Sequence, residues 1–221
     1  MNLIQAIEER KSIRGFLDRP VPGPTIQKIL HTARWSPSGV NLQPWRVEVA
    51  MGRTLVALRT RLTALAGAGE PKNPDYQFYP DTWKEPYLGR RRATGFGLLE
   101  AMGIRSDDAE ARRQAFLANY SFFGAPVALL LFMDRSMGQG AWMDMGMFFQ
   151  TVMLTAHAHG LGSCPQAAVA DYPDAVRELL HVDHQYILLG CLAMGYPDPQ
   201  AKANTLRTSR LEVEQFAVFH E

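Results

Sequence analysis

The sequence predicts an α+β fold in which a small sheet is packed between helices. Two apolar runs, at residues 125–133 and 186–194, have the length and composition of strands that are covered on both faces. The segments around them follow a helical spacing, without the repeating strand–helix–strand order of a parallel sheet. At 221 residues the chain can form a single domain, residues 1–221, with a substantial core.

The first part of the chain is predicted to form two helices, a strand and a further helix. An apolar stripe predicts a helix over residues 2–10, and Pro24 precedes a second helix at 25–35. Alternation of apolar and polar residues predicts a half-buried strand at 45–51. A helix at about 54–66 follows this strand.

Residues 67–122 are predicted to be an insertion of one loop and two helices. The periodicity stops between residues 67 and 86, and helices follow at 87–102 and 107–122, the second with Ser106 as its N-cap. A long loop in a compact domain is usually functional or mobile. Its aromatic residues either stack on an aromatic ligand or pack onto the core from the surface. They are Tyr76, Phe78, Tyr79, Trp83 and Tyr87, of which Trp83 and Tyr87 are the expected substrate contacts.

A nearly uncharged helix is predicted at 141–159, where Asp144 is the only acid or base other than histidine. Such a helix is either central to the core or packed against a partner subunit. A short helix at 173–180 precedes the strand at 186–194, and residues 197–221 form an extended tail.

The charge and motif content excludes several classes of function. A net charge of +1 gives no general attraction to nucleic acid or to a membrane surface, and no apolar run reaches the roughly 20 residues of a membrane helix. Two cysteines make no disulfide framework, so we expect a cytoplasmic protein. The uncharged neighbours of Cys164 favour a core or loop cysteine over a reactive thiol. Dinucleotide and P-loop fingerprints are absent, and the histidines lack metal-ligand spacing.

The segment RKSIRGF, residues 10–16, places Arg10, Ser12 and Arg14 at alternate positions. In an extended chain these side chains share one side and Ile13 faces the other. Two guanidinium groups and a hydroxyl suit a phosphate better than a single carboxylate. The alternative is a solvated strand whose arginines pair with surface acids.

The segment SPSGVNLQPW, residues 36–45, joins a helix to a strand through residues that restrict the backbone. Such a loop is held in one shape and offers hydrogen bonds to a flat heteroaromatic edge. Alternatively, its short polar side chains satisfy their own backbone.

Five segments resemble the nitroreductase family of FMN flavoproteins. They are AIEERKSIRGF, SPSGVNLQPW, GLGSCPQAA, LGCLAMGYPDP and NTLRTSRLEVEQF, in family order between residues 6 and 216. PYLGRRRATGFGLLEAMGI and NYSFFGAPVALLLFMDR are similar to the nitrobenzoate and nitroarene reductase branch. The resemblance implies a nitroreductase-like fold with a small, central, mostly antiparallel sheet between helices. It also implies an intertwined homodimer with FMN at the subunit interface.

The resemblance also implies roles for individual residues. The FMN phosphate would be held by Arg10, Ser12 and Arg210, with Arg207 beside them, and Lys11 would also bind the cofactor. Arg14 would lie at the N1/O2 edge of the flavin, where a fixed positive charge favours the reduced form. The other subunit would contribute Pro37, Ser38, Gly39 and Asn41, and a backbone N–H of the segment Pro165, Gln166, Ala167 and Ala168 would face flavin N5. Family members often have Glu-Gly at the last two positions, so a backbone donor is kept here and a carboxylate is not.

In the implied reaction, NADPH or NADH and then a small aromatic acceptor use the same open face of the flavin in turn. No dedicated dinucleotide domain or catalytic side chain is then needed, because the flavin carries the chemistry. We expect reduction of nitroaromatic compounds or quinones. The alternatives are a related FMN enzyme acting on an ene, a halogenated phenol or flavin itself, and a non-catalytic protein that binds FMN.

Overall fold

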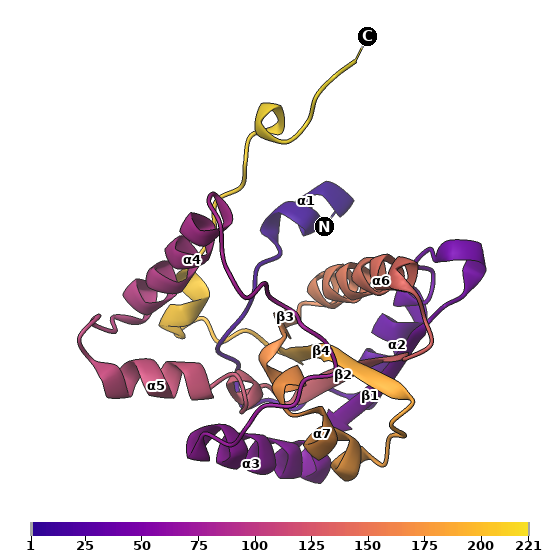
Figure 1. Ribbon diagram of the computed structural model, residues 1–221, viewed down its shortest axis with the longest axis horizontal. Helices are drawn as coiled ribbons and strands as arrows, with labels where there is room; N and C mark the ends of the chain where they lie inside the picture. Colours follow the sequence, from indigo (N-terminus) through magenta and orange to yellow (C-terminus); the bar gives the residue numbers. More distant parts are fainter. Residues whose placement is uncertain (1, 221) are drawn as a thin grey trace.

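The computed structural model describes residues 2–220, and within them an antiparallel four-stranded sheet lies at the centre (Figure 1). The strand order is β1-β2-β4-β3. The strands are β1 (Trp45–Met51), β2 (Val127–Asp134), β3 (Gly162–Gln166) and β4 (Tyr186–Gly195). The α+β prediction and the three predicted strands are confirmed, whereas β3 was not predicted.

The helices agree closely with their predicted positions, apart from α5. They are α1 (Leu3–Glu9), α2 (Gly23–Ala33), α3 (Gly52–Ala68), α4 (Tyr87–Met102), α5 (Ala109–Leu117), α6 (Gln139–Ala158) and α7 (Pro173–Leu180). The helix predicted at 107–122 was too long, and the prediction of Ser106 as its cap was wrong. The Asp108 side chain caps α5 by accepting a hydrogen bond of 2.9 Å from the backbone N–H of Ala111.

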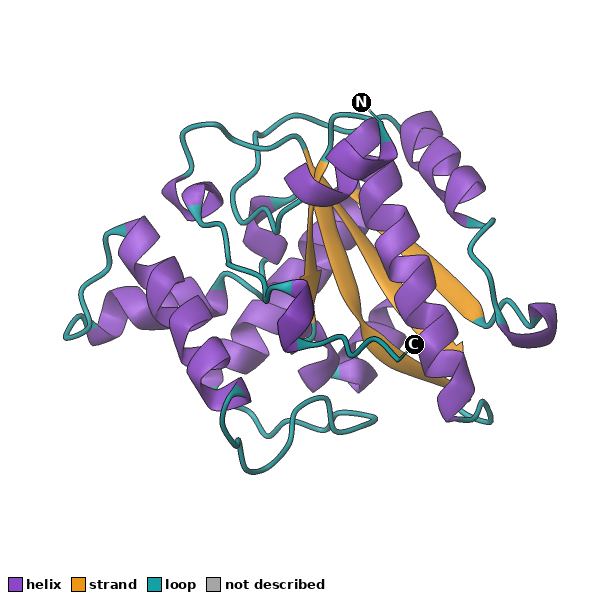
Figure 2. Ribbon diagram, turned by 90° about the horizontal axis from the view of Figure 1, so that it is seen from above, coloured by secondary structure: helices purple, strands orange, loops and turns teal. Residues whose placement is uncertain are grey.

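The central strand β2 supplies core residues to both faces of the sheet, because successive side chains of a strand point to opposite faces. Leu130 and its even-numbered neighbours pack in the core that includes residues of α3 and α7. Leu129 and its odd-numbered neighbours pack in the core that includes residues of α2 and α6. The sheet is therefore covered by helices on both faces, as the uninterrupted apolar run of β2 predicts (Figure 2).

Helix α4 lies at the edge of the molecule, beside the first part of the C-terminal tail (Figure 1). None of its residues, 87–102, is buried. The tail crosses the body near residues 201–206 and then extends away from it (Figure 1). No helix within residues 2–220 combines the length and the apolar character needed to cross a membrane.

Candidate functional site

A cavity of about 790 Å³ lies where the two ends of the chain meet. This basic cavity is lined by residues 7–8, 10–12, 14, 94 and 206–210. Its cationic side chains are Arg10, Lys11, Arg14, Arg207 and Arg210, and Glu8 is the one acid among the described lining residues. The structure thus brings together every residue that was predicted to hold the phosphate, from segments about 190 positions apart.

The N-terminal segment is held in the extended form by β3. Ser12 and Ser163 form a parallel bridge, and the backbone N–H of Ile13 donates to Ser163 O at 2.9 Å. Ile13 is buried, and Gly162 leaves room for it, since a Cβ at Gly162 would lie 2.6 Å from Ile13 Cγ1. With Ile13 turned inward, Arg10, Ser12 and Arg14 line the cavity, as their alternation predicts.

Asn204 fastens the tail to this N-terminal segment. The buried side chain accepts a 2.7 Å hydrogen bond from the backbone N–H of Arg14 and donates at 2.8 Å to Gly15 O. The Lys11 ammonium donates at 2.5 Å to the Asn204 backbone carbonyl. Gly15 allows this approach, because a Cβ there would lie 2.3 Å from the Ala201 side chain. Sequence reasoning missed Asn204, since no local pattern marks a contact across the whole chain.

The cations of the basic cavity are not neutralised by carboxylates. None of the five forms a salt bridge within residues 2–220. The buried Nε of Arg10 has no hydrogen-bond partner among these residues. Burial and the nearby Arg210 lower the pKa of Arg10 below its usual value. The alternative prediction of arginines paired with surface acids is therefore wrong, and the cavity is suited to an anion.

A second cavity of about 980 Å³, the aromatic cavity, lies between α6 and the long loop. Aromatic rings from both elements line it, namely Tyr76, Phe78, Tyr79, Trp142 and Phe149. No charged side chain of residues 2–220 is among its lining residues. Uncharged walls of this kind suit a flat apolar ligand, which would stack on the rings.

The end of β3 forms one wall of the aromatic cavity through Pro165, Gln166 and Ala167. The Gln166 side chain turns away, because its Nε2 donates at 2.7 Å to Asn119 O. Gln166 therefore presents its backbone to this wall. Gly190 lines the same wall, and a Cβ there would lie 2.7 Å from Gln166 O. Ala168 instead packs against the core on the α3 and α7 side.

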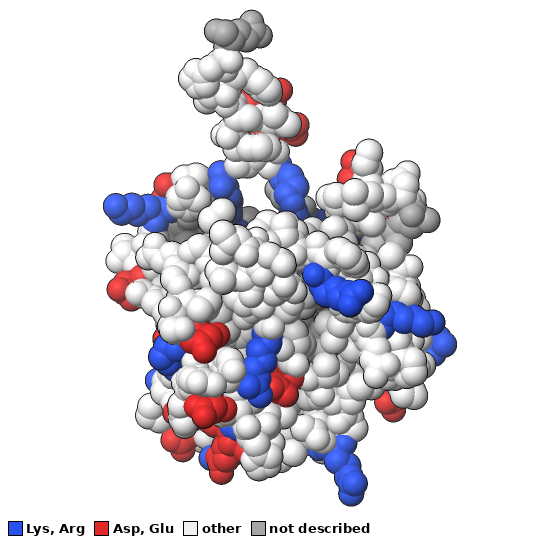
Figure 3. All heavy atoms as spheres, turned by 90° about the vertical axis from the view of Figure 1, so that its right-hand side faces the viewer, with Lys and Arg blue, Asp and Glu red and all other residues white. Residues whose placement is uncertain are grey.

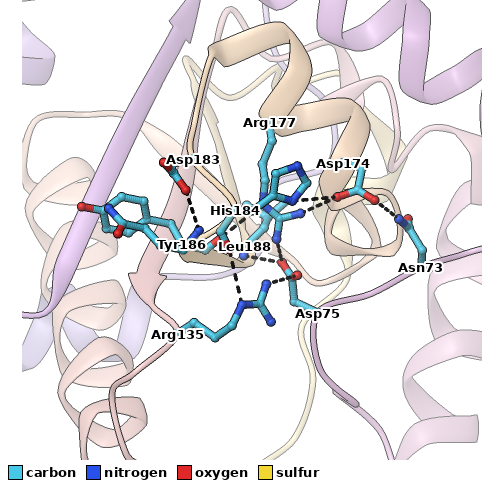
Figure 4. Close-up of polar contacts among 10 residues, drawn as sticks. Asn73, Asp75, Arg135, Asp174, Arg177, Asp183, His184, Tyr186 and Leu188 are labelled. Carbon is cyan, nitrogen blue, oxygen red and sulfur yellow. Dashed lines mark hydrogen bonds and ion pairs between the residues drawn. The ribbon is translucent and has the colours of Figure 1, made fainter.

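The start of the long loop is anchored by an ion-pair network around Asp75 (Figure 4). The Asp75 carboxylate accepts from Arg177, from Arg135 at 2.8 Å and from the backbone N–H of Leu188 at 2.9 Å. Arg177 is 3% exposed and also donates at 2.8 Å to Asp174. These bonds hold the pKa of Asp75 below its usual value, although burial opposes them.

The anchor at Asp75 positions Tyr76 in the aromatic cavity. The Tyr76 hydroxyl donates at 2.6 Å to Leu189 O, and its ring lies edge-on to Trp142 with 4.6 Å between centroids. The predicted substrate residues Trp83 and Tyr87 do not line this cavity. Trp83 lies beside Tyr79, and its ring also contacts Arg91. The loop residues placed for stacking are thus Tyr76, Phe78 and Tyr79.

The loop with Pro37, Ser38, Gly39 and Asn41 lines neither cavity. It is nevertheless held in one shape, as predicted. Gly39 N–H donates to both carboxylate oxygens of the buried Asp144 at 3.2 Å, and Ser38 Oγ accepts from the backbone of Gln43 at 3.0 Å. This second bond matches the alternative that the loop's polar side chains serve its own backbone.

The model of one protein family, described as the nitroreductase family, matches residues 7–196. This chain belongs to the nitroreductase family. It is 34% identical to the chloronitrobenzene nitroreductase of Comamonas testosteroni over 217 residues, which cover 97% of this chain and 96% of the relative. It is also 34% identical to the 4-nitrobenzoate reductase of Pseudomonas putida over 218 residues, covering 96% and 93% of the two chains.

Two crystal structures of nitroreductases superpose on the whole of this family member. One is the FMN and NADPH-dependent nitroreductase NfnB of Sphigopyxis sp. strain HMH, with a TM-score of 0.97, 36% identity and complete coverage of both chains. The other is the FMN-dependent NfnB of Mycobacterium smegmatis in complex with NADPH, with a TM-score of 0.93, 31% identity and complete coverage of both chains. The nitroreductase-like fold implied by the sequence is confirmed.

Proposed function

We propose that this nitroreductase-family protein is an FMN-dependent NAD(P)H oxidoreductase that reduces nitroaromatic compounds. One observation carries the proposal: five cations without carboxylate partners in residues 2–220 line one cavity, and β3 links it to the uncharged aromatic one, since Ser12 pairs with Ser163 and residues 165–167 line the aromatic cavity. A monophosphate attached to a flat ring system matches this pair of cavities. The named relatives, which are nitroarene and nitrobenzoate reductases, support the choice of acceptor.

The phosphate of FMN is assigned to the basic cavity. Arg10 and Arg210 would bind it through guanidinium groups, and Ser12 and Lys11 lie on the same segment. A dianion there would offset the burial and the repulsion from Arg210 that lower the pKa of Arg10, and it would give the buried Nε an acceptor. The chain therefore fits this group, and Arg207 lies next to it with one nitrogen bonded to Glu8 O.

The flavin ring is assigned to the region between Arg14 and Ala167. FMN supplies the two-electron redox chemistry when bound, and the chain binds and orients the reactants. The Arg14 guanidinium would stabilise negative charge at the N1/O2 edge, and the backbone of residues 165–167 would supply a hydrogen-bond donor. The hydride donor and the nitroaromatic acceptor would occupy the aromatic cavity in turn, with Tyr76 and Phe78 stacking on them.

A homodimer with FMN at its interface completes the proposed site. The loop of residues 37–41 is mostly exposed and is held by hydrogen bonds, yet it lines neither the basic nor the aromatic cavity, so a second copy would receive it. Figure 3 views the side where α2 and α6 lie in Figure 1 and shows a broad uncharged area in its upper middle. Met143 on α6 and Phe216 and Phe219 in the tail are more than half exposed, which a partner subunit would cover.

The protein is proposed to be cytoplasmic and to form a single domain, and each proposal has its own support. Cys164 and Cys191 are both free thiols, which suits a reducing environment. Both core clusters include residues of β2, so residues 67–122 and the tail attach to one central sheet.

The experiment that tests the function is a visible spectrum of the purified protein, followed by anaerobic oxidation of NADPH with and without nitrobenzene. We expect flavin absorption bands, and dinucleotide oxidation that depends on the nitro compound. A colourless protein that does not take up added FMN would contradict the cofactor assignment. If the protein binds FMN but shows no turnover that depends on the acceptor, it is a non-catalytic FMN-binding protein and the proposed enzyme activity is rejected.

A further inference from the structure

A third cavity of about 630 Å³ lies between α4 and the tail and shares part of its lining with the basic cavity. It is lined by residues 90, 93–94 and 206–211, so the tail segment 206–210 forms a wall of both cavities. Its charged lining residues within the described chain are Arg90, Arg207 and Arg210, and Thr94, Thr208 and Ser209 add hydroxyl groups. Arg207 and Arg210 also line the basic cavity, so Arg90 is the cation that this cavity adds, and guanidinium groups with hydroxyls and no acid among them suit a phosphate.

One face of α4 positions Arg90 at this cavity. Residues 90, 94 and 97 are spaced by four and three positions, which places them on the same side of a helix. A Cβ at Gly97 would lie 3.3 Å from Leu206 Cδ1, so this face contacts the tail closely. Thr94, one turn earlier, lines both cavities. Arg90, a further turn away, lines only the third.

The cations around the two cavities exceed what one FMN phosphate requires. Arg90 joins the five cations of the basic cavity, and it too forms no salt bridge within residues 2–220. A monophosphate carries at most two negative charges. Arg10 and Arg210 are assigned to that phosphate, and one nitrogen of Arg207 is bonded to Glu8 O. Arg90 and the remaining N–H groups of Arg207 can therefore bind a second anion.

We propose that the third cavity binds a phosphate group of the nicotinamide dinucleotide that donates the hydride. This proposal rests on the proposed function, which requires that such a donor bind beside FMN. The donor carries phosphate in two places, the pyrophosphate present in both NADH and NADPH and the 2′-phosphate present in NADPH alone. Arg90 is the residue that tests the assignment, because it lies outside the cavity assigned to FMN.

The test compares Arg90→Gln with Arg92→Gln in the FMN-loaded protein. Both variants remove one positive charge from α4, but Arg92 lines none of the three cavities. Dissociation constants are measured by calorimetry for 2′,5′-ADP, which carries the 2′-phosphate, and for ADP, which carries the diphosphate. KM is measured for NADPH and for NADH with nitrobenzene as the acceptor.

We expect Arg90→Gln to weaken binding roughly tenfold through the loss of a charge-assisted hydrogen bond, and Arg92→Gln to have little effect. If Arg90→Gln weakens the binding of 2′,5′-ADP but not of ADP, and raises KM for NADPH but not for NADH, the cavity is assigned to the 2′-phosphate. If the variant weakens the binding of both probes and raises KM for both donors, the cavity is assigned to the pyrophosphate. Unchanged binding in Arg90→Gln, or equal weakening in both variants, overturns the proposal.

The measurements also distinguish failure of this proposal from failure of the proposed nitroreductase function. FMN content and turnover of the unmodified protein test the function, and neither depends on where the donor's phosphate binds. If the unmodified protein reduces nitrobenzene and Arg90→Gln binds both probes normally, only the third-cavity assignment fails. If the unmodified protein lacks FMN, both fail together.

Discussion

Arg177 is buried and Arg10 is partly buried, and the two differ in the charges that surround them. Arg177 bonds to two carboxylates, Asp75 and Asp174, and to the Tyr186 carbonyl (Figure 4). Arg10 has no carboxylate partner within residues 2–220, and burial and the charge of Arg210 lower its pKa. The first region resembles a structural ion-pair network, and the second is prepared for a charge that the polypeptide does not supply.

The contrast separates structural arginines from ligand-binding ones in a single chain. A buried cation without a counter-charge is unfavourable for folding, whereas a buried pair offsets much of this cost and becomes strongly destabilising when one partner is removed. Removal of an arginine should therefore change stability in the Asp75 network and ligand binding in the basic cavity.

The largest expected effect comes from breaking the network with Arg177→Met. The substitution leaves Asp75 and Asp174 without their buried partner, so the free energy of unfolding should fall by about 3–5 kcal/mol. Guanidinium denaturation of the FMN-free variant and of the unmodified FMN-free protein measures this difference in the free energy of unfolding. FMN bound per folded molecule should not change, since Arg177 lies outside the basic cavity.

The matched control for this variant is Arg105→Gln, which breaks the ion pair with Asp107 on the exposed surface. Its denaturation midpoint should stay that of the unmodified protein, because surface pairs contribute little. An Arg177→Met protein as stable as this control would show that the network is not structural.

The second prediction concerns Arg10→Ala in the basic cavity. Loss of a charge-assisted hydrogen bond should weaken FMN binding by about 10- to 100-fold. The free energy of unfolding of the FMN-free variant should be unchanged or higher, because a partly buried cation next to Arg210 has been removed. Flavin fluorescence titration and denaturation measure the two quantities.

The exposed Arg53, which lines neither cavity, provides the control for loss of one positive charge. FMN affinity should be normal in Arg53→Ala. If Arg10→Ala destabilised the FMN-free protein as strongly as Arg177→Met, the contrast between the two regions would disappear.

Local patterns in the sequence predict the parts of the site that depend on neighbouring residues. Alternation in residues 10–14 correctly places Arg10, Ser12 and Arg14 on one side, with Ile13 inward. The apolar run of β2 likewise predicts its burial on both faces. In both cases the backbone repeat fixes the direction of each side chain.

The parts that were missed depend on contacts between distant segments. Strand β3 contains Gly162 and Pro165, which are unfavourable in strands, and it forms because β4 offers a partner. The hydrogen bonds of Asn204 and the contact of Gly97 with Leu206 join positions whose spatial relation no periodicity expresses. Composition predicts Trp83 and Tyr87 as substrate contacts, whereas the anchor at Asp75 places Tyr76 in the cavity wall.

The smallest expected effect concerns Cys164, which is close to the unpaired arginines. Burial raises the pKa of Cys164 to about 11, and the charges of Arg14 and Arg10 offset this only in part. At pH 8 about one thiol in a thousand would then be ionised, and the side chain is also inaccessible. Iodoacetamide at pH 8 should leave Cys164 unmodified in the folded FMN-free protein and modify it after denaturation, as measured by mass spectrometry.

Rapid modification of folded Cys164 would mean that the nearby cations stabilise a thiolate, and the basic cavity would then have an internal anion. The Arg10→Ala variant distinguishes the two situations, because loss of a thiolate partner would slow the modification. We expect no difference between this variant and the unmodified protein. Arg10 and Arg14 would then remain without an anion from their own chain, which is the property that separates them from Arg177 and makes a bound phosphate favourable.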